Sequence, residues 1–139
     1  MDFVKIETEN FEELKELQKA YKAEIGEDAP TEDDFRRLEK AIEKEEIIFY
    51  GCICEERLVA CCSISFTFST FNYQKAGVFE DFYIRPDFRH KGIARNLVTF
   101  AYEESGGGSL TVGCADCDVE LYKAIGFEIP LGNMLAFAE

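Results

Sequence analysis

The spacing of hydrophobic and polar residues changes several times along the chain, and each change predicts a new element. Apolar and polar side chains alternate over residues 3–8, which predicts a strand. Apolar side chains then recur every three or four positions over 10–25 and again over 31–42, which predicts two amphipathic helices. Pro30 and the acidic residues 32–34 are typical of a helix start, where the helix dipole favours negative charge. The first third of the chain is therefore expected to fold as one strand followed by two helices.

From Ile47 onward the pattern is dominated by short strands. The apolar runs 47–54 and 58–68 flank the polar break 55–57, which predicts an antiparallel hairpin. The other expected elements are a strand over 78–85, a helix over 92–104, a strand over 109–113, a helix over 119–125, and closing strands around 127–129 and 134–137. No repeat or linker interrupts this order, so we expect a single domain over residues 1–139, with mixed α/β structure on one sheet.

The charge balance narrows the classes of partner. The 139 residues include 28 Asp and Glu but only 15 Lys and Arg, which gives a net charge of −13. This excess argues against nucleic acids and anionic membranes as partners, because both are bound by cationic surfaces. No apolar run approaches the roughly 18 residues that cross a bilayer, and the start of the chain lacks the pattern of a secretory signal. We expect a folded cytoplasmic protein.

Six cysteines occur as three close pairs, Cys52 and Cys54, Cys61 and Cys62, and Cys114 and Cys117. A disulfide framework is not expected in a reducing compartment, which leaves buried apolar thiols or a metal or redox site. Cys54, Cys61 and Cys62 lie among apolar residues of the predicted strands, which favours a core role. A zinc site would need a second paired cluster beside the one C-x-x-C. We therefore expect no metal and keep a metal or redox site as a minor alternative.

The segment 85–95 has the opposite charge to the rest of the chain. It contains four basic residues and one acidic residue, and it places a predicted strand, a turn and a predicted helix in direct succession. A helix start exposes unpaired backbone N–H groups and the positive end of the helix dipole, so it can bind an anion. Gly92 would let the backbone approach a phosphate closely. The plain alternative is a solvated helix start that happens to carry basic residues.

Arg89, Gly92 and Ala94 spell Arg-x-x-Gly-x-Ala in this turn, which resembles motif A of the GNAT superfamily of N-acetyltransferases. In that family the loop holds the pyrophosphate of acetyl-CoA. Downstream, residues 121–127 read Leu-Tyr-Lys-Ala-Ile-Gly-Phe and look like the family's motif B, Leu-Tyr-x-x-x-Gly-Phe. The order of the predicted strands and helices is also similar to that of the family. The resemblance implies the GNAT fold, an α/β (α+β) arrangement in which helices flank a mixed, mostly antiparallel central sheet.

The resemblance also implies where acetyl-CoA would bind as cosubstrate. Its pyrophosphate would lie on residues 90–95, and its pantetheine arm would run along the backbone of residues 82–84 like an added strand. The cofactor-binding residues implied in this way are Phe82, Tyr83, Ile84, Arg89, His90, Lys91, Gly92, Ile93, Ala94 and Arg95. The chain departs from the family pattern before motif B, where Ala115 and Asp118 stand in place of a common asparagine and alanine. Asp116 or Asp118 is then the candidate to replace the asparagine contact.

An amine acceptor needs a base, and the predicted strand 78–85 carries two candidates, Glu80 and Asp81. In a regular strand neighbouring side chains point to opposite faces, Glu80 with Phe82 and Asp81 with Tyr83, so only one carboxylate enters a given cleft. The Glu-Asp-Phe run resembles that of spermidine/spermine acetyltransferases, in which the matching glutamate is assigned the role of base. We favour Glu80 as the base, directly or through a water, with Asp81 as its substitute or as an amine-binding group.

The motif B resemblance assigns Tyr122 the role of the acid that protonates the departing CoA thiolate, and a core aromatic is the structural alternative. The acceptor pocket of the family would lie near residues 20–35 and 69–77. The first of these regions is acidic, with Glu27 and Asp28 as candidate acceptor-binding residues. An acidic wall suits a cationic amine, and ordinary solubilising charge is the competing explanation.

The function that these features favour is an acetyl-CoA-dependent N-acetyltransferase, an acyltransferase acting by direct attack on a primary amine of a small, cationic acceptor. The alternative from another class is a GNAT-fold module that senses acyl-CoA without catalysis, and a cysteine-based metal or redox protein is the weakest. No nucleic-acid or membrane partner is expected, and a homodimer is kept open.

Overall fold

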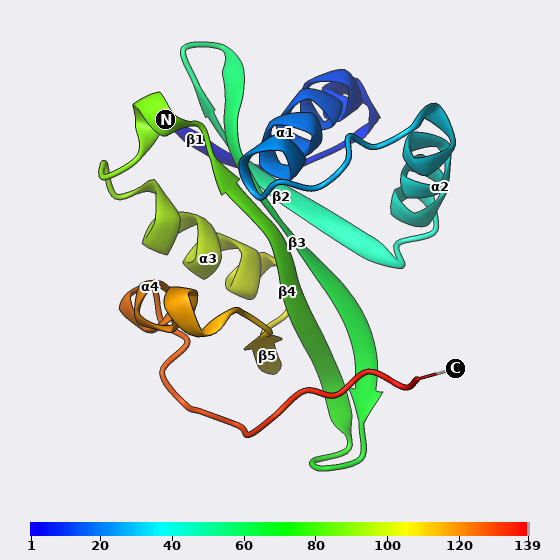
Figure 1. Ribbon diagram of the computed structural model, residues 1–139, viewed down its shortest axis with the longest axis vertical. Coiled ribbons are helices and arrows are strands. Elements are labelled where there is room, and N and C mark those ends of the chain that lie inside the picture. The colour runs from blue at the N-terminus through cyan, green and yellow to red at the C-terminus, as the bar shows by residue number, and fades with distance from the viewer. Residues whose placement is uncertain (139) are drawn as a thin grey trace.

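Within residues 1–138, five strands form a single sheet in the order β1-β2-β3-β4-β5 (Figure 1). A computed structural model describes residues 1–138. The strands are β1 (Asp2–Lys5), β2 (Ile47–Cys54), β3 (Arg57–Ser69), β4 (Gln74–Ile84) and β5 (Ser109–Val112). Neighbouring strands are antiparallel except β4 and β5, which are parallel. The expected mixed, mostly antiparallel sheet is confirmed.

Helices cover both faces of this sheet (Figure 1). One face carries α1 (Phe11–Glu24) and α2 (Glu32–Glu43), and the other carries α3 (Ile93–Glu104) and α4 (Val119–Ala124). Short 3-10 turns lie at Thr8–Asn10, Pro86–Phe88 and Asp116–Asp118. Within residues 1–138 no helix is long and apolar enough to cross a membrane.

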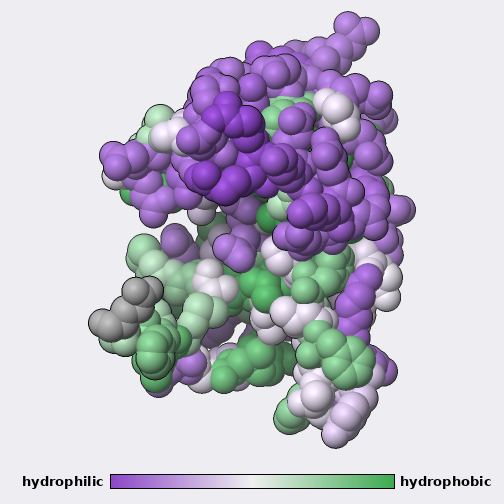
Figure 2. Space-filling view, turned by 90° about the vertical axis from the view of Figure 1, so that its right-hand side faces the viewer, coloured by the Kyte–Doolittle hydropathy of each residue, from purple (hydrophilic) through white to green (hydrophobic). Residues whose placement is uncertain are grey.

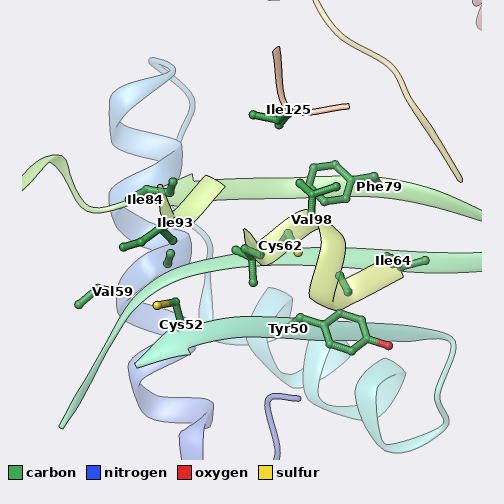
Figure 3. Packing of buried hydrophobic residues seen from close by; sticks show 13 residues of the cluster. Tyr50, Cys52, Val59, Cys62, Ile64, Phe79, Ile84, Ile93, Val98 and Ile125 are labelled. Atoms are coloured by element: carbon green, nitrogen blue, oxygen red, sulfur yellow. The ribbon is translucent and has the colours of Figure 1, made fainter. Parts of the chain in front are cut away.

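Each face of the sheet has its own hydrophobic core. The core between the sheet and α3 contains Phe79 and Val98 (Figure 3), and the core beneath α1 and α2 contains Leu14. Side chains alternate along β3, so Cys61 belongs to the α1 core and its neighbour Cys62 to the α3 core. The strands between the two layers are therefore held from both sides, which gives a rigid frame for side chains at the end of β4.

Three cysteines have a core role. Cys52, Cys61 and Cys62 are buried, and burial raises the pKa of the Cys61 and Cys62 thiols, so both stay protonated and unreactive. Cys54 is half-buried, whereas the two cysteines of the C-x-x-C are exposed. Within residues 1–138 no group of three or more His, Cys, Asp or Glu side chains is placed to hold a metal ion.

The closing strands expected around 127–129 and 134–137 are wrong, because residues 127–138 form neither helix nor strand. Pro130 lacks a backbone N–H and Gly132 has a φ of 100°, so the backbone between the two apolar stretches does not hold a strand conformation. β5 is consequently an edge strand of the sheet. The large apolar side chains of this segment are exposed: Ile129, Leu131, Met134, Leu135 and Phe137.

Candidate active site

The site lies where β4 and β5 part. Their parallel pairing runs from Ala76 opposite Ser109 to Phe79 opposite Val112, but β4 continues to Ile84. Beyond Phe79 the backbone groups on this edge of β4 have no strand partner within the described residues. An extended ligand that carries amide groups can pair with such an edge as an added strand does.

A β-bulge sits on β4 at this opening. The register between β3 and β4 shifts between the pairs Cys61–Tyr83 and Ser63–Glu80, and Asp81 has a φ of 55°. One extra residue on β4 breaks the alternation of side chains. The rings of Phe79 and Phe82 therefore lie on the same side of the sheet, with centroids 5.6 Å apart.

The prediction that Glu80 shares a face with Phe82, and that only one carboxylate enters the cleft, is wrong because of this bulge. Glu80 and Asp81 both act on the hydroxyl of Tyr21 in α1. Burial raises the pKa of Tyr21 most, and the charges of Asp81, Glu27 and Glu80 add to the rise in that order. The two carboxylates therefore lie together on the α1 side of the opening.

Asp81 is held firmly, in contrast to Glu80. The Ser63 hydroxyl donates a hydrogen bond to Asp81 Oδ2 at 2.6 Å, and the Gln18 amide donates one to Oδ1 at 3.4 Å. Glu80 is exposed, and among the described residues its side chain has no hydrogen bond or ion pair. The opening therefore contains one fixed and one free carboxylate.

Tyr122 of α4 approaches the same opening from the other face of the sheet. Burial raises its pKa to about 12, and the neighbouring Tyr21, Asp118 and Cys114 add to the rise. Its ring lies 6.3 Å from that of Phe82 on β4. Tyr122 therefore lies against the part of β4 that continues beyond its pairing with β5. A phenol with this pKa is protonated at neutral pH and can donate its proton.

The turn before α3 has the geometry of an anion site. Gly92 caps the helix with a φ of 84°, and a Cβ added there would meet nothing within 4 Å. His90 also has a positive φ, 61°, and the segment 90–92 is exposed. The first N–H groups of α3 have no partner inside the helix, so the turn offers backbone donors to solvent at the positive end of the helix.

Arg89 and Arg95 use their side chains to brace this turn. Arg89 Nε donates to the Ile84 carbonyl at 2.8 Å, and its Nη2 binds Glu24 of α1 at 2.7 Å. Arg95 Nη1 donates to the Ala124 carbonyl at the end of α4 at 3.0 Å. The sequence alone does not show whether these two arginine side chains brace the turn or are free to bind an anion.

A pocket of about 360 Å³ lies between α1 and α2. Its walls are formed by Gln18, Lys22, Asp28, Pro30, Asp34, Phe35 and Leu38. Of the two acidic residues expected at an acceptor, Asp28 lines the pocket. Glu27 instead accepts a 2.9 Å hydrogen bond from Lys22, and this contact raises the pKa of the lysine. The space-filling view shows a hydrophilic half over α1 and α2 and a recess between it and the hydrophobic half below (Figure 2).

The acetyltransferase (GNAT) family model matches residues 11–127. The chain belongs to the GNAT acetyltransferase family. The resemblance inferred from Arg-x-x-Gly-x-Ala and Leu-Tyr-x-x-x-Gly-Phe is confirmed, and the family uses acetyl-CoA.

Solved GNAT structures have the same fold. An aminoglycoside acetyltransferase from an uncultured soil metagenomic sample, in complex with sisomicin, aligns with a TM-score of 0.83 and 12% identity over 99% of this chain and 95% of its own. A predicted acetyltransferase from Clostridium acetobutylicum with acetyl-CoA aligns with a TM-score of 0.79 and 16% identity over the same shares. A probable acetyltransferase aligns over 100% of both chains, with a TM-score of 0.82 and 21% identity. No relative was found among the curated proteins.

The structure of this GNAT protein brings most of the predicted site residues together. Residues 82–84 end β4 and lead through one 3-10 turn into 89–95, and both carboxylates and Tyr122 lie at the start of this stretch. Glu27 is paired with Lys22, and its charge also contributes to the raised pKa of Tyr21. Sequence reasoning missed three residues, Gln18, Tyr21 and Ser63. In the sequence they look like ordinary members of a helix and a strand, and they reach Asp81 through the packing of α1 on the sheet and the pairing of β3 with the bulged β4.

Proposed function

We propose that the protein transfers the acetyl group of acetyl-CoA to a primary amine of a small, cationic acceptor. The observation that carries this proposal is that a free and a fixed carboxylate on one face of β4, and a protonated phenol packed against Phe82 on the other, flank the open edge of this strand directly before the exposed start of α3. These are the groups that acyl transfer to an ammonium compound needs: a base, a binding anion and an acid.

Acetyl-CoA fits the backbone features of β4 and of the turn before α3. The exposed turn at 90–92 and the first turn of α3 would receive the pyrophosphate, with His90 and Lys91 as the free basic side chains. The unpaired edge at 82–84 would receive the amide groups of the pantetheine arm. Arg89 and Arg95 contribute by holding this turn in place.

Glu80 acts as the base in this proposal. An alkyl ammonium with a pKa of about 10.4 is neutral in only about one molecule in 10³ at pH 7, a cost of roughly 4–5 kcal/mol. Glu80, which is free and exposed, takes the proton from the amine. The nitrogen then forms its bond to the acetyl carbon while the carbon–sulfur bond breaks, and Tyr122 gives its proton to the departing sulfur. The new amide nitrogen then loses its second proton to the Tyr122 phenolate, and Glu80 releases its proton to solvent, so that both residues return to their starting states.

Asp81 binds the acceptor's ammonium group before the reaction. Its fixed carboxylate offers charge in a defined position, and Asp28 adds negative charge in the neighbouring pocket. The net charge of −13 favours cationic acceptors in general. All six cysteines are free, as they would stay in the reducing cytoplasm where we place the protein.

CoA release over a panel of primary amines tests the function. We expect acetyl-CoA to be consumed with cationic amines, and the rate to fall as salt is raised, because salt screens the acidic acceptor site. A protein that binds acetyl-CoA in calorimetry and releases no CoA with any amine is instead the non-catalytic sensor.

We also propose that two copies form a homodimer through their hydrophobic halves. Each copy offers an open β5 edge and the exposed apolar segment 129–137, and open edges and apolar patches favour self-association. We expect sedimentation velocity to give a dimer, and Leu135→Glu combined with Phe137→Glu to give a monomer. Ile25→Glu, at an exposed apolar site at the far end of α1, is the control that should remain dimeric. A wild-type monomer contradicts the proposal.

A further inference from the structure

Two buried polar side chains converge on one carboxylate. Among residues 1–138 the buried polar or charged side chains are Gln18, with 8% of its surface exposed, and Ser63, with 0%. Both donate hydrogen bonds to Asp81, one to each carboxylate oxygen. The two residues come from different elements, α1 and β3, and stand far from Asp81 in the sequence.

Packing does not explain these residues. A buried hydroxyl or amide loses its hydrogen bonds to water, and an alanine or leucine would fill the same apolar core without that cost. Ser63 lies on β3 two residues from Cys61, on the face whose core is formed by Leu14 and Leu17. Among residues 1–138 the two polar side chains find their hydrogen-bond partner in Asp81, and they hold its carboxylate in a single orientation.

We propose that Ser63 and Gln18 are positioning residues that fix the Asp81 carboxylate to receive the acceptor's ammonium group. This inference rests on the proposed acetyl transfer. A carboxylate has about four acceptor positions, so the bonds from Ser63 and Gln18 leave others for the ammonium N–H groups. Fixing the anion beforehand reduces the entropy lost when the acceptor binds. Glu80 has no such support and remains free to move a proton.

Gln18 also connects the anion to the rest of the acceptor. Its side chain lines the pocket between α1 and α2 and reaches Asp81. An acceptor whose ammonium lies on Asp81 extends past Gln18 toward Asp28 in that pocket. Gln18 therefore contributes to the choice of acceptor as well as to the position of the carboxylate.

Ser63→Ala tests the inference. We expect the KM for the acceptor to rise about tenfold, because a hydrogen bond to a charged group is lost. The KM for acetyl-CoA and kcat should change by less than about twofold. Ser65→Ala is the matched control, since Ser65 lies on the same strand and face, has no hydrogen bond from its side chain among the described residues and should leave all constants unchanged. Gln18→Met, which keeps the length of the side chain without its amide, should raise the acceptor KM as Ser63→Ala does.

A double-mutant cycle with Asp81→Asn separates positioning from a merely structural role. Once the carboxylate is gone, Ser63→Ala should raise the acceptor KM no further. With Asp81 in place, Ser63→Thr keeps the hydroxyl and should therefore keep the acceptor KM near the wild-type value. Melting temperatures of all variants are recorded alongside. An equal rise in KM from Ser63→Ala with and without Asp81, or no rise at all, overturns this inference while the acetyl transfer stands. If the wild-type protein consumes acetyl-CoA with none of the amines in the panel, the proposed function is overturned and this inference with it.

Discussion

Tyr122→Phe is expected to lower kcat by about 10²–10⁴-fold, the usual contribution of a positioned acid, while the affinity for acetyl-CoA stays unchanged. The substitution removes only the hydroxyl that protonates the departing thiolate. The ring remains to pack against Phe82 and Phe127, so α4 should keep its place. Steady-state kinetics and calorimetry with acetyl-CoA measure the two quantities separately.

The pH dependence follows from the raised pKa of Tyr122. Because burial raises this pKa to about 12, the phenol keeps its proton well above the pH at which an ordinary tyrosine ionises. The wild-type rate should therefore show no decline from ionisation of Tyr122 up to about pH 10. Tyr50→Phe is the matched control, since burial also raises the pKa of Tyr50 to about 12 but this residue lies in the α3 core. An unchanged kcat in Tyr122→Phe removes the residue from the mechanism.

The anion turn could be predicted from the sequence because its geometry is local. A strand, a short basic turn with Gly92, and a helix follow one another within the segment 78–104, and each has its own pattern. The start of α2 is local in the same way, and Thr31 and Asp34 form the capping box at its first turn. Short-range hydrogen bonds and the spacing of apolar residues determine such elements.

The carboxylate pair could not be predicted because it depends on a partner strand. The alternation rule assumes one residue of β4 opposite each residue of β3, and the bulge at Asp81 breaks this pairing. Gln18 and Tyr21 come close to Asp81 through the packing of α1 on the sheet, and Ser63 through the pairing of β3 with β4. The closing strands fail for a related reason. Apolar spacing over 134–137 indicates which side chains avoid water, but a strand also needs hydrogen bonds from a neighbour.

The division of work between the two carboxylates leads to opposite kinetic effects. Glu80→Gln should lower kcat at pH 7 by about 10²–10⁴-fold, because the amine then loses its proton without a base, and the KM for the acceptor should change little. Asp81→Asn should do the reverse and raise the acceptor KM with a smaller loss in kcat. Side-by-side kinetics of the two variants with the best amine of the panel make this comparison.

Raising the pH should rescue Glu80→Gln, because a larger share of the amine is then already neutral in solution and needs no base on the protein. The rate should climb by about tenfold per pH unit toward the amine pKa of about 10.4, while Asp81→Asn gains no such advantage because its defect is in binding the ammonium form. If Asp81→Asn is the variant that loses kcat and recovers at high pH, the fixed carboxylate is the base. The free Glu80 would then have no part in proton transfer, and the hydrogen bonds from Ser63 and Gln18 would serve to orient a base instead of an ammonium anchor.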